Sequence, residues 1–188
     1  MKNIVILVGK DGRGSNMLNI IKACKNGELN AKVSAVVSPT CHNFATEEAL
    51  NYGIPVVVLP YKISSYSEHL IRFIRHADIV CLAGYMKLLS PEVIQSCPVI
   101  LNVHPSLLPK FGGQGMYGFA VHEAVIAAGE KESGCTIHYV NERYDEGAII
   151  HQKRCPVHPN DTAIDLAGRV LKLEHQAYLH VLKQLCVD

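Results

Sequence analysis

The sequence has almost no excess of charge of either sign. Its 18 lysines and arginines are balanced by 17 aspartates and glutamates, which leaves a formal charge of +1 over 188 residues. Proteins that bind nucleic acid or an anionic membrane surface through their overall charge carry a basic patch or run, and the mixed charges here form none. We therefore expect neither partner, and any bound anion must be held by a local site.

Paired cysteines and long apolar segments are also missing. The seven cysteines form no Cys-x-x-Cys pair, and several lie in apolar runs where a thiol packs as a small hydrophobic group. The chain passes from Met1 directly into a short strand pattern, with no apolar segment long enough to cross a membrane. These features predict a cytoplasmic protein in a reducing environment, without a signal peptide or a membrane span.

Metal-ligand spacings and the dinucleotide fingerprint are absent as well. His122 is not followed by a second histidine one helical turn later, and His175 and His180 are five residues apart, so we expect no metal site. Directly after the glycine-containing segment 9–16, Met17 stands where the third glycine of a dinucleotide-binding loop belongs. No acidic residue ends the second strand, so an NAD site is not expected.

What the chain does contain is an alternation of short β-branched runs with segments of helical periodicity. With 48% hydrophobic residues, it predicts one domain, 1–188, of the α/β class: a mostly parallel, twisted, Rossmann-like sheet with helices on both faces. The expected strands cover residues 4–8, 33–37, 56–59, 79–83, 99–103, 136–140 and 149–155. The expected helices cover residues 15–26, 45–52, 67–76, 91–95, about 122–128, and 162–185.

Segment 9–16 lies between the first expected strand and the first helix. Its glycines allow backbone amides to turn inward, and the helix N-terminus adds partial positive charge. This arrangement suits a single phosphate group. A tight strand-to-helix turn without a ligand is the alternative.

A second polar group follows the fifth strand, at Asn102 and His104 before Pro105, and Asp145 comes about forty residues later. Residues two apart on a strand face the same side, so both side chains can meet one substrate. A carboxylate beside His104 would favour the imidazolium, which is a good acid and oxyanion stabiliser. The alternative is a proline-bounded turn with an asparagine cap.

The segment 83–91 ends the fourth strand, at the edge where open α/β sheets bind ligands. Its methionine and leucines could hold a flat heterocycle. Simple packing of the strand end on a neighbouring helix would explain the same residues.

Five motifs, taken in order, resemble those of phosphoribosylglycinamide formyltransferase: Gly12-Arg13-Gly14-Ser15-Asn16, Ala83-Gly84-Tyr85-Met86-Lys87-Leu88-Leu89-Ser90-Pro91, Asn102-Val103-His104-Pro105-Ser106-Leu107-Leu108-Pro109, Gly134-Cys135-Thr136-Ile137-His138-Tyr139-Val140 and Asp145-Glu146-Gly147. The resemblance implies a formyltransferase fold. It also implies a phosphate- and nucleotide-binding half, about 1–100, and a folate and catalytic half, about 101–188.

The resemblance implies formyl transfer from 10-formyltetrahydrofolate to the amine of glycinamide ribonucleotide in de novo purine biosynthesis. His104 would be the general acid, Asn102 would bind the formyl oxygen, and Asp145 would keep His104 charged and help move protons. No metal is implied, and the protein would be a monomer or homodimer.

The remaining site residues are also carried over from the resemblance. The substrate would be bound by Gly14, Ser15, Asn16 and Glu174, and the folate by Met86, Lys87, Leu88, Leu89 and Asn102. Lys62 is the candidate for the folate tail, and the loop 112–118 is expected to act as a substrate flap.

Two other functions fit parts of the pattern. A non-catalytic module could bind a sugar phosphate or folate, although binding alone needs no charged histidine beside a carboxylate. A 10-formyltetrahydrofolate hydrolase would use water in place of the amine. The expected ribonucleotide site at Ser15, Asn16 and Glu174 argues against hydrolysis.

Overall fold

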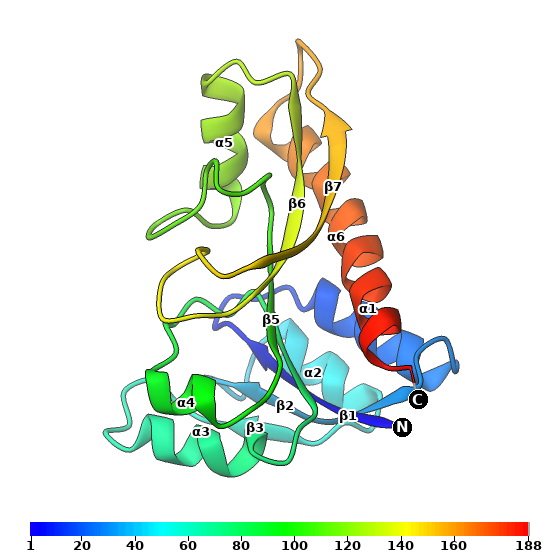
Figure 1. The fold of residues 1–188 in the computed structure, drawn as a ribbon, viewed down its shortest axis with the longest axis vertical. Coiled ribbons are helices and arrows are strands. Elements are labelled where there is room, and N and C mark those ends of the chain that lie inside the picture. The colour runs from blue at the N-terminus through cyan, green and yellow to red at the C-terminus, as the bar shows by residue number, and fades with distance from the viewer. Residues whose placement is uncertain (188) are drawn as a thin grey trace.

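A seven-stranded sheet runs through the whole protein in the computed structural model, which describes residues 1–187 (Figure 1). The strand order is β3-β2-β1-β4-β5-β6-β7. The strands are β1 Lys2–Val8, β2 Ala31–Ser38, β3 Val56–Val58, β4 Ile79–Ala83, β5 Ile100–His104, β6 Glu132–Tyr139 and β7 Ile149–Pro156. The helices are α1 Ser15–Lys25, α2 Phe44–Asn51, α3 Tyr66–Ile74, α4 Pro91–Gln95, α5 Phe119–Ala127 and α6 Ala163–Leu185.

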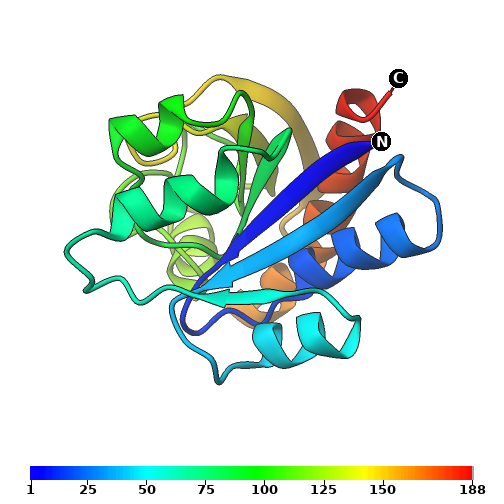
Figure 2. The ribbon, with the colours of Figure 1, turned by 90° about the horizontal axis from the view of Figure 1, so that it is seen from below.

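The central strands are buried on both faces, as their unbroken apolar sequences require. Along β1, Ile4 and Ile6 pack into one core together with residues of α1, α2 and α6. Val5 and Leu7 point to the opposite face, where they pack with residues of α3 and α4. The view from below in Figure 2 shows helices on both sides of these strands. The alternation of neighbouring residues between two cores is what fixes the three-layer arrangement.

The strand order reverses beside β1, and this positions the site. β1 pairs in parallel with β2 on one side and with β4 on the other, so the segments that follow β1 and β4 leave the sheet in different directions. The crevice outside the carboxyl ends of such strands is where open α/β sheets bind ligands. The loops after β1, β4 and β5 all open at this edge.

Of the last two strands, β6 runs antiparallel to β5, and β7 runs antiparallel to β6 and so in the direction of the first five strands. β5 pairs with β6, which places Asn102 opposite His138 and His104 opposite Thr136. Helix α6 then packs along β6 and β7 and against α1, as the red and orange helix of Figure 1 shows. Through this return, residues from the end of the chain reach the edge where β1 ends.

The α/β fold expected from the sequence is confirmed, with its mostly parallel sheet covered on both faces. The main differences in the boundaries are that β6 begins at Glu132 instead of residue 136, α5 begins at Phe119, and β3 has only three residues. The start of β6 is polar and contains Gly134, so its strand state comes from pairing with β7 and not from its own pattern.

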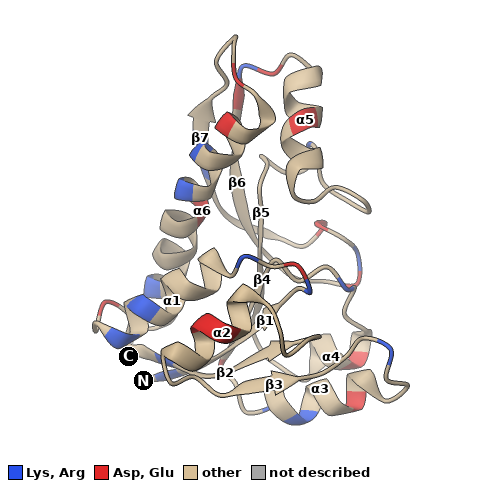
Figure 3. Cartoon of the chain, turned by 180° about the vertical axis from the view of Figure 1, so that it is seen from behind, with Lys and Arg blue, Asp and Glu red and all other residues tan. Residues whose placement is uncertain are grey.

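Lysines, arginines, aspartates and glutamates are interspersed along the ribbon in the view of Figure 3. No helix within residues 1–187 is long and apolar enough to span a membrane.

Candidate active site

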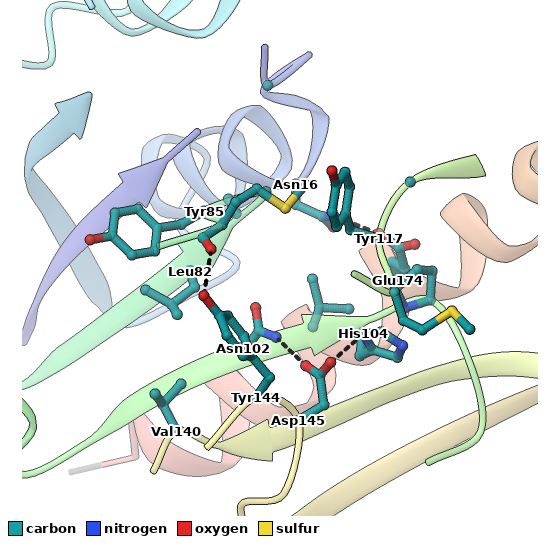
Figure 4. Close-up of a pocket in the computed structure, with 18 of the residues that line it drawn as sticks. Asn16, Leu82, Tyr85, Asn102, His104, Tyr117, Val140, Tyr144, Asp145 and Glu174 are labelled. Atoms are coloured by element: carbon teal, nitrogen blue, oxygen red, sulfur yellow. Dashed lines mark hydrogen bonds and ion pairs between the residues drawn. The ribbon is translucent and has the colours of Figure 1, made fainter. Parts of the chain in front are cut away.

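A cavity of about 610 Å³ opens at the carboxyl edge of β1, β4 and β5. Its walls come from the loop after β1, segment 82–89, the end of β5, residues 113–118 of the glycine-rich loop, the start of α5, the loop 140–145, and one face of α6. Figure 4 shows side chains from these segments pointing into a common space. Apart from Lys62, all of the residues expected to act in catalysis or binding, from Gly14 to Glu174, line this cavity.

His104 is buried at the end of β5, and both of its ring nitrogens face acceptors. Nε2 lies 2.8 Å from the carbonyl oxygen of Phe111, and Nδ1 lies 3.3 Å from Oδ2 of Asp145. A neutral imidazole has a single N–H and can satisfy only one of these acceptors. Both contacts are hydrogen bonds only when both ring nitrogens carry hydrogen.

Asp145 is held in place by several donors. Its carboxylate accepts the backbone N–H of Gly113 at 3.0 Å and faces His104, and its backbone has a left-handed φ of 58°. Burial by itself would raise the pKa of Asp145, but the hydrogen bonds from its partners, His104 first, hold that pKa well below its usual range. The carboxylate is thus ionised at neutral pH.

Asn102 is oriented by His138, which sequence reasoning did not include among the site residues. His138 Nδ1 lies 2.9 Å from the carbonyl oxygen of Tyr139, and its Nε2 lies 3.2 Å from the Asn102 amide nitrogen and 3.6 Å from Oδ1 of Asp145. The same amide lies 3.5 Å from Oδ1 of Asp145. The contact results from the antiparallel pairing of β5 and β6, so no local sequence pattern predicts it.

The glycine loop after β1 makes a tight approach to β4. A Cβ on Gly9 would lie 2.1 Å from the carbonyl oxygen of Gly84, so only glycine fits there. Gly14, at the N-cap of α1, has a φ of 66°, which favours glycine, and no side chain caps this helix end. Asn43 donates to the carbonyl oxygens of Gly9 and Lys10 and fixes the loop from outside.

Asn16 and Glu174 meet where α1 approaches α6. The Asn16 amide donates to Glu174 Oε2 at 2.7 Å, while its own Oδ1 is buried without a partner. Burial raises the pKa of Glu174, although Asn16 and the charge of His104 oppose this. The pair thus contains a buried acceptor without a hydrogen-bond partner.

Segment 86–89 forms the opposite wall. The Tyr144 hydroxyl reaches across and donates to the carbonyl oxygen of Met86 at 3.4 Å (Figure 4). Lys87 lines the cavity with its ammonium 5.2 Å from the ring centre of Tyr66 and 5.8 Å from that of Tyr61. Lys62 is exposed and does not line the cavity, so Lys87 is the better candidate for contact with an anionic tail.

His122 is a further residue of the cavity wall that sequence reasoning missed as a site residue. It is buried in α5, its Nδ1 has no hydrogen-bond partner, and burial together with the nearby charge of His104 lowers its pKa to about 4. It is therefore neutral at pH 7. The helical segment around it carries no motif that distinguishes it from a core histidine. Within residues 1–187, no group of three or more His, Cys, Asp or Glu side chains is arranged to hold a metal ion.

The formyl transferase family profile matches residues 2–182. The chain belongs to the formyl transferase family. It is 43% identical to a chloroplastic phosphoribosylglycinamide formyltransferase of Vigna unguiculata, with all of this chain and 62% of the relative covered. It is 36% identical to the phosphoribosylglycinamide formyltransferase of Haemophilus influenzae, with 97% of this chain and 86% of the relative covered.

The solved structures agree with these relatives. Glycinamide ribonucleotide transformylase 1 from Geobacillus kaustophilus is similar with a TM-score of 0.89 at 31% identity, and the match covers 100% of both chains. The resemblance drawn from the sequence motifs is confirmed. The chain spans less than two thirds of the length of the Vigna unguiculata relative, because 62% of that protein is matched.

Proposed function

We propose that this protein transfers the formyl group of 10-formyltetrahydrofolate to the amine of glycinamide ribonucleotide, a step of de novo purine biosynthesis. The observation that carries the proposal is the placement of the buried His104–Asp145 pair, with Asn102, in the middle of a cavity. Asn16 and Glu174 lie on one wall of that cavity, and segment 86–89 lies on another. Two substrates can thus meet at one acid.

Attack of the amine on the formyl carbon places negative charge on the formyl oxygen. His104 and Asn102 both carry N–H groups at the end of β5, where they can donate to this oxygen, and such preorganised donors are worth several kcal/mol. Asp145 keeps His104 charged until its proton is transferred to the folate nitrogen that leaves. The proton released by the attacking amine, which Asp145 helps to move, restores the charge of His104. No covalent bond to the protein is required.

The binding roles are proposed from the same cavity. Gly14, Ser15 and Asn16 would bind the phosphate through the N-terminus of α1, and Glu174 would accept hydroxyl hydrogens of the ribose. Met86, Lys87, Leu88, Leu89 and Asn102 would bind the folate. In this reading residues 1–100 supply most of the phosphate site and residues 101–188 the catalytic group, although segment 86–89 brings part of the folate site into the first half.

Hydrolysis of the formyl-folate is the main competing reaction, because the same acid could serve an attacking water. The unused Oδ1 of Asn16 and the buried Glu174 favour a substrate with hydroxyl groups at this end of the cavity. A pure binding module would gain nothing from ionising Asp145 beside His104 in a buried position.

An absorbance assay of 10-formyltetrahydrofolate consumption, run with and without glycinamide ribonucleotide, tests the proposal. We expect consumption only when the ribonucleotide is present. Consumption at the same rate without it would establish hydrolysis, and no consumption under either condition would leave binding alone.

Two further features stay predictions. A cytoplasmic location is supported by the cysteines, all seven of which are free thiols, as a reducing compartment allows. The expected oligomeric state, monomer or homodimer, can be settled by light scattering of the purified protein.

A further inference from the structure

The three basic side chains that line the cavity differ in their partners. Arg143 forms an ion pair with Glu146 at 3.2 Å. Lys87 lies above two tyrosine rings, and the Arg13 guanidinium lies 5.9 Å from the ring centre of Phe119. Neither Arg13 nor Lys87 forms an ion pair with a carboxylate in the described part of the chain. Two cations of the cavity are therefore available to anionic ligands.

Arg13 stands at the end of the cavity that suits a phosphate. It precedes Gly14, whose left-handed backbone begins α1 without a side-chain cap. The partial positive charge of that helix end and the charge of the preceding arginine both favour an anion at this end of the cavity. An observation beside it points to a ligand with hydroxyl groups, as a ribonucleotide has: Asn16 is 9% exposed, lines the cavity, and leaves its Oδ1, a hydrogen-bond acceptor, without a partner.

The ring of Phe119 is the contact of the Arg13 guanidinium. Phe119 is the first residue of α5 and directly follows the glycine-rich loop, and 43% of its surface is exposed. A cation on an exposed aromatic ring is held more weakly than one that makes charge-assisted, bidentate hydrogen bonds to a phosphate. A phosphate can therefore draw Arg13 from the ring, while the ring keeps the side chain from dispersing into solvent before binding.

We propose that Arg13 is a phosphate-binding, specificity-determining residue of the ribonucleotide site, and that Phe119 is the positioning residue that holds it at the cavity rim. The inference rests on the proposed function for the identity of the substrate. Arginine suits the role because its planar fork matches phosphate geometry. The contact also joins the phosphate loop to the end of the glycine-rich loop, so the two loops are coupled through one side chain.

The test compares glycinamide ribonucleotide with its dephosphorylated riboside. For Arg13→Met we expect the KM for the ribonucleotide to rise at least tenfold and the KM for the riboside to change less than twofold. Arg13→Lys should recover part of the difference. The matched control is Lys22→Met, which removes one charge from α1 where that lysine rests on the ring of Tyr52, outside the cavity. It should keep the wild-type ratio of the two KM values.

An Arg13→Met variant with the wild-type ratio would overturn the proposal, as would an equal rise in both KM values. Failure of the proposed function is a separate result, because then the wild type would formylate neither compound. In that case the phosphate-binding role of Arg13 is tested by calorimetric titration with ribose 5-phosphate. Binding at least tenfold weaker in Arg13→Met than in Lys22→Met supports this role, and equal binding in the two variants overturns it.

The positioning role of Phe119 has its own readout. Phe119→Leu should raise the ribonucleotide KM about threefold, and the double variant Arg13→Met/Phe119→Leu should have the KM of Arg13→Met alone. Additive effects would show that Phe119 acts independently of Arg13.

Discussion

The Oδ2 atom of Asp145 lies 3.3 Å from Nδ1 of His104, although the two residues are 41 positions apart in the sequence. Asp145 has a left-handed φ of 58°, and its carboxylate faces the ring. The same Oδ2 atom also accepts the backbone N–H of Gly113. On the other side of the ring, the Phe111 carbonyl oxygen accepts Nε2–H. Asp145 and the Phe111 carbonyl group thus fix both nitrogens of the His104 ring.

Removing the imidazole should abolish most of the chemistry and little of the binding. We expect His104→Ala to lower kcat at least about a hundredfold, because it removes a donor that acts on charge developed in the transition state. The Kd for a folate analogue, measured by fluorescence titration, should stay within a few-fold of wild type. A variant with near-normal turnover would remove His104 from the proposed role.

Asp145→Asn tests the charge and not the shape. Its kcat should also fall at least about a hundredfold, and the loss should be greatest at higher pH, because the imidazolium has lost its counter-ion. Steady-state rates measured between pH 6 and 9, a range chosen to span histidine titration, give the comparison. A profile of unchanged shape, merely scaled down, would contradict this assignment.

Placing a carboxylate at the start of α1 should exclude the phosphate. Ser15 is the first residue of that helix, and Ser15→Asp should raise the KM for glycinamide ribonucleotide at least about tenfold, or about 1.4 kcal/mol, with little change for the folate. Ser15→Ala serves as the uncharged control. If the folate KM rose in place of the ribonucleotide KM, the two sites would have to be exchanged.

His122 should make the fold less stable in weak acid. Its pKa is lowered to about 4, so between this value and the ordinary value near 6.5 only the unfolded chain binds the proton. Stability from this residue is fully present above pH 6.5 and is lost as the pH falls toward 4, by at most about 2 kcal/mol at pH 5. Urea unfolding of wild type and His122→Asn at pH 7 and pH 5 checks this. The variant should lose less stability than wild type over that interval, and an equal loss in both proteins would contradict the assignment.

Much of the fold could be predicted because its signals are local. The apolar runs of β1 and β4 have the length and β-branched content of buried strands, and both were expected within two residues of their bounds. The early start of β6 at Glu132 was not, because pairing with β7 imposes it on a polar segment. Propensity cannot report a pairing that tertiary contacts create.

In the candidate site, too, local patterns predict some features, and others depend on contacts between distant parts of the chain. Asn102 and His104 could be grouped from their spacing on one strand, whereas the approach of Asp145 was inferred only from the family resemblance. The contact of His138 with Asn102 depends on the antiparallel register of β5 and β6, and that of Arg13 with Phe119 depends on two loops meeting in space. Neither contact can be predicted from the sequence around the residues that form it.

The fate of the formyl carbon tests the central claim most directly. With 10-formyltetrahydrofolate labelled with ¹³C at the formyl group, and with glycinamide ribonucleotide present, NMR should find the label in the amide of the formylated ribonucleotide. The label should remain on the folate when Asp145→Asn replaces the wild type over the same interval. Label released by the wild type as free formate, with none in the ribonucleotide, would contradict formyl transfer and assign hydrolysis to this site.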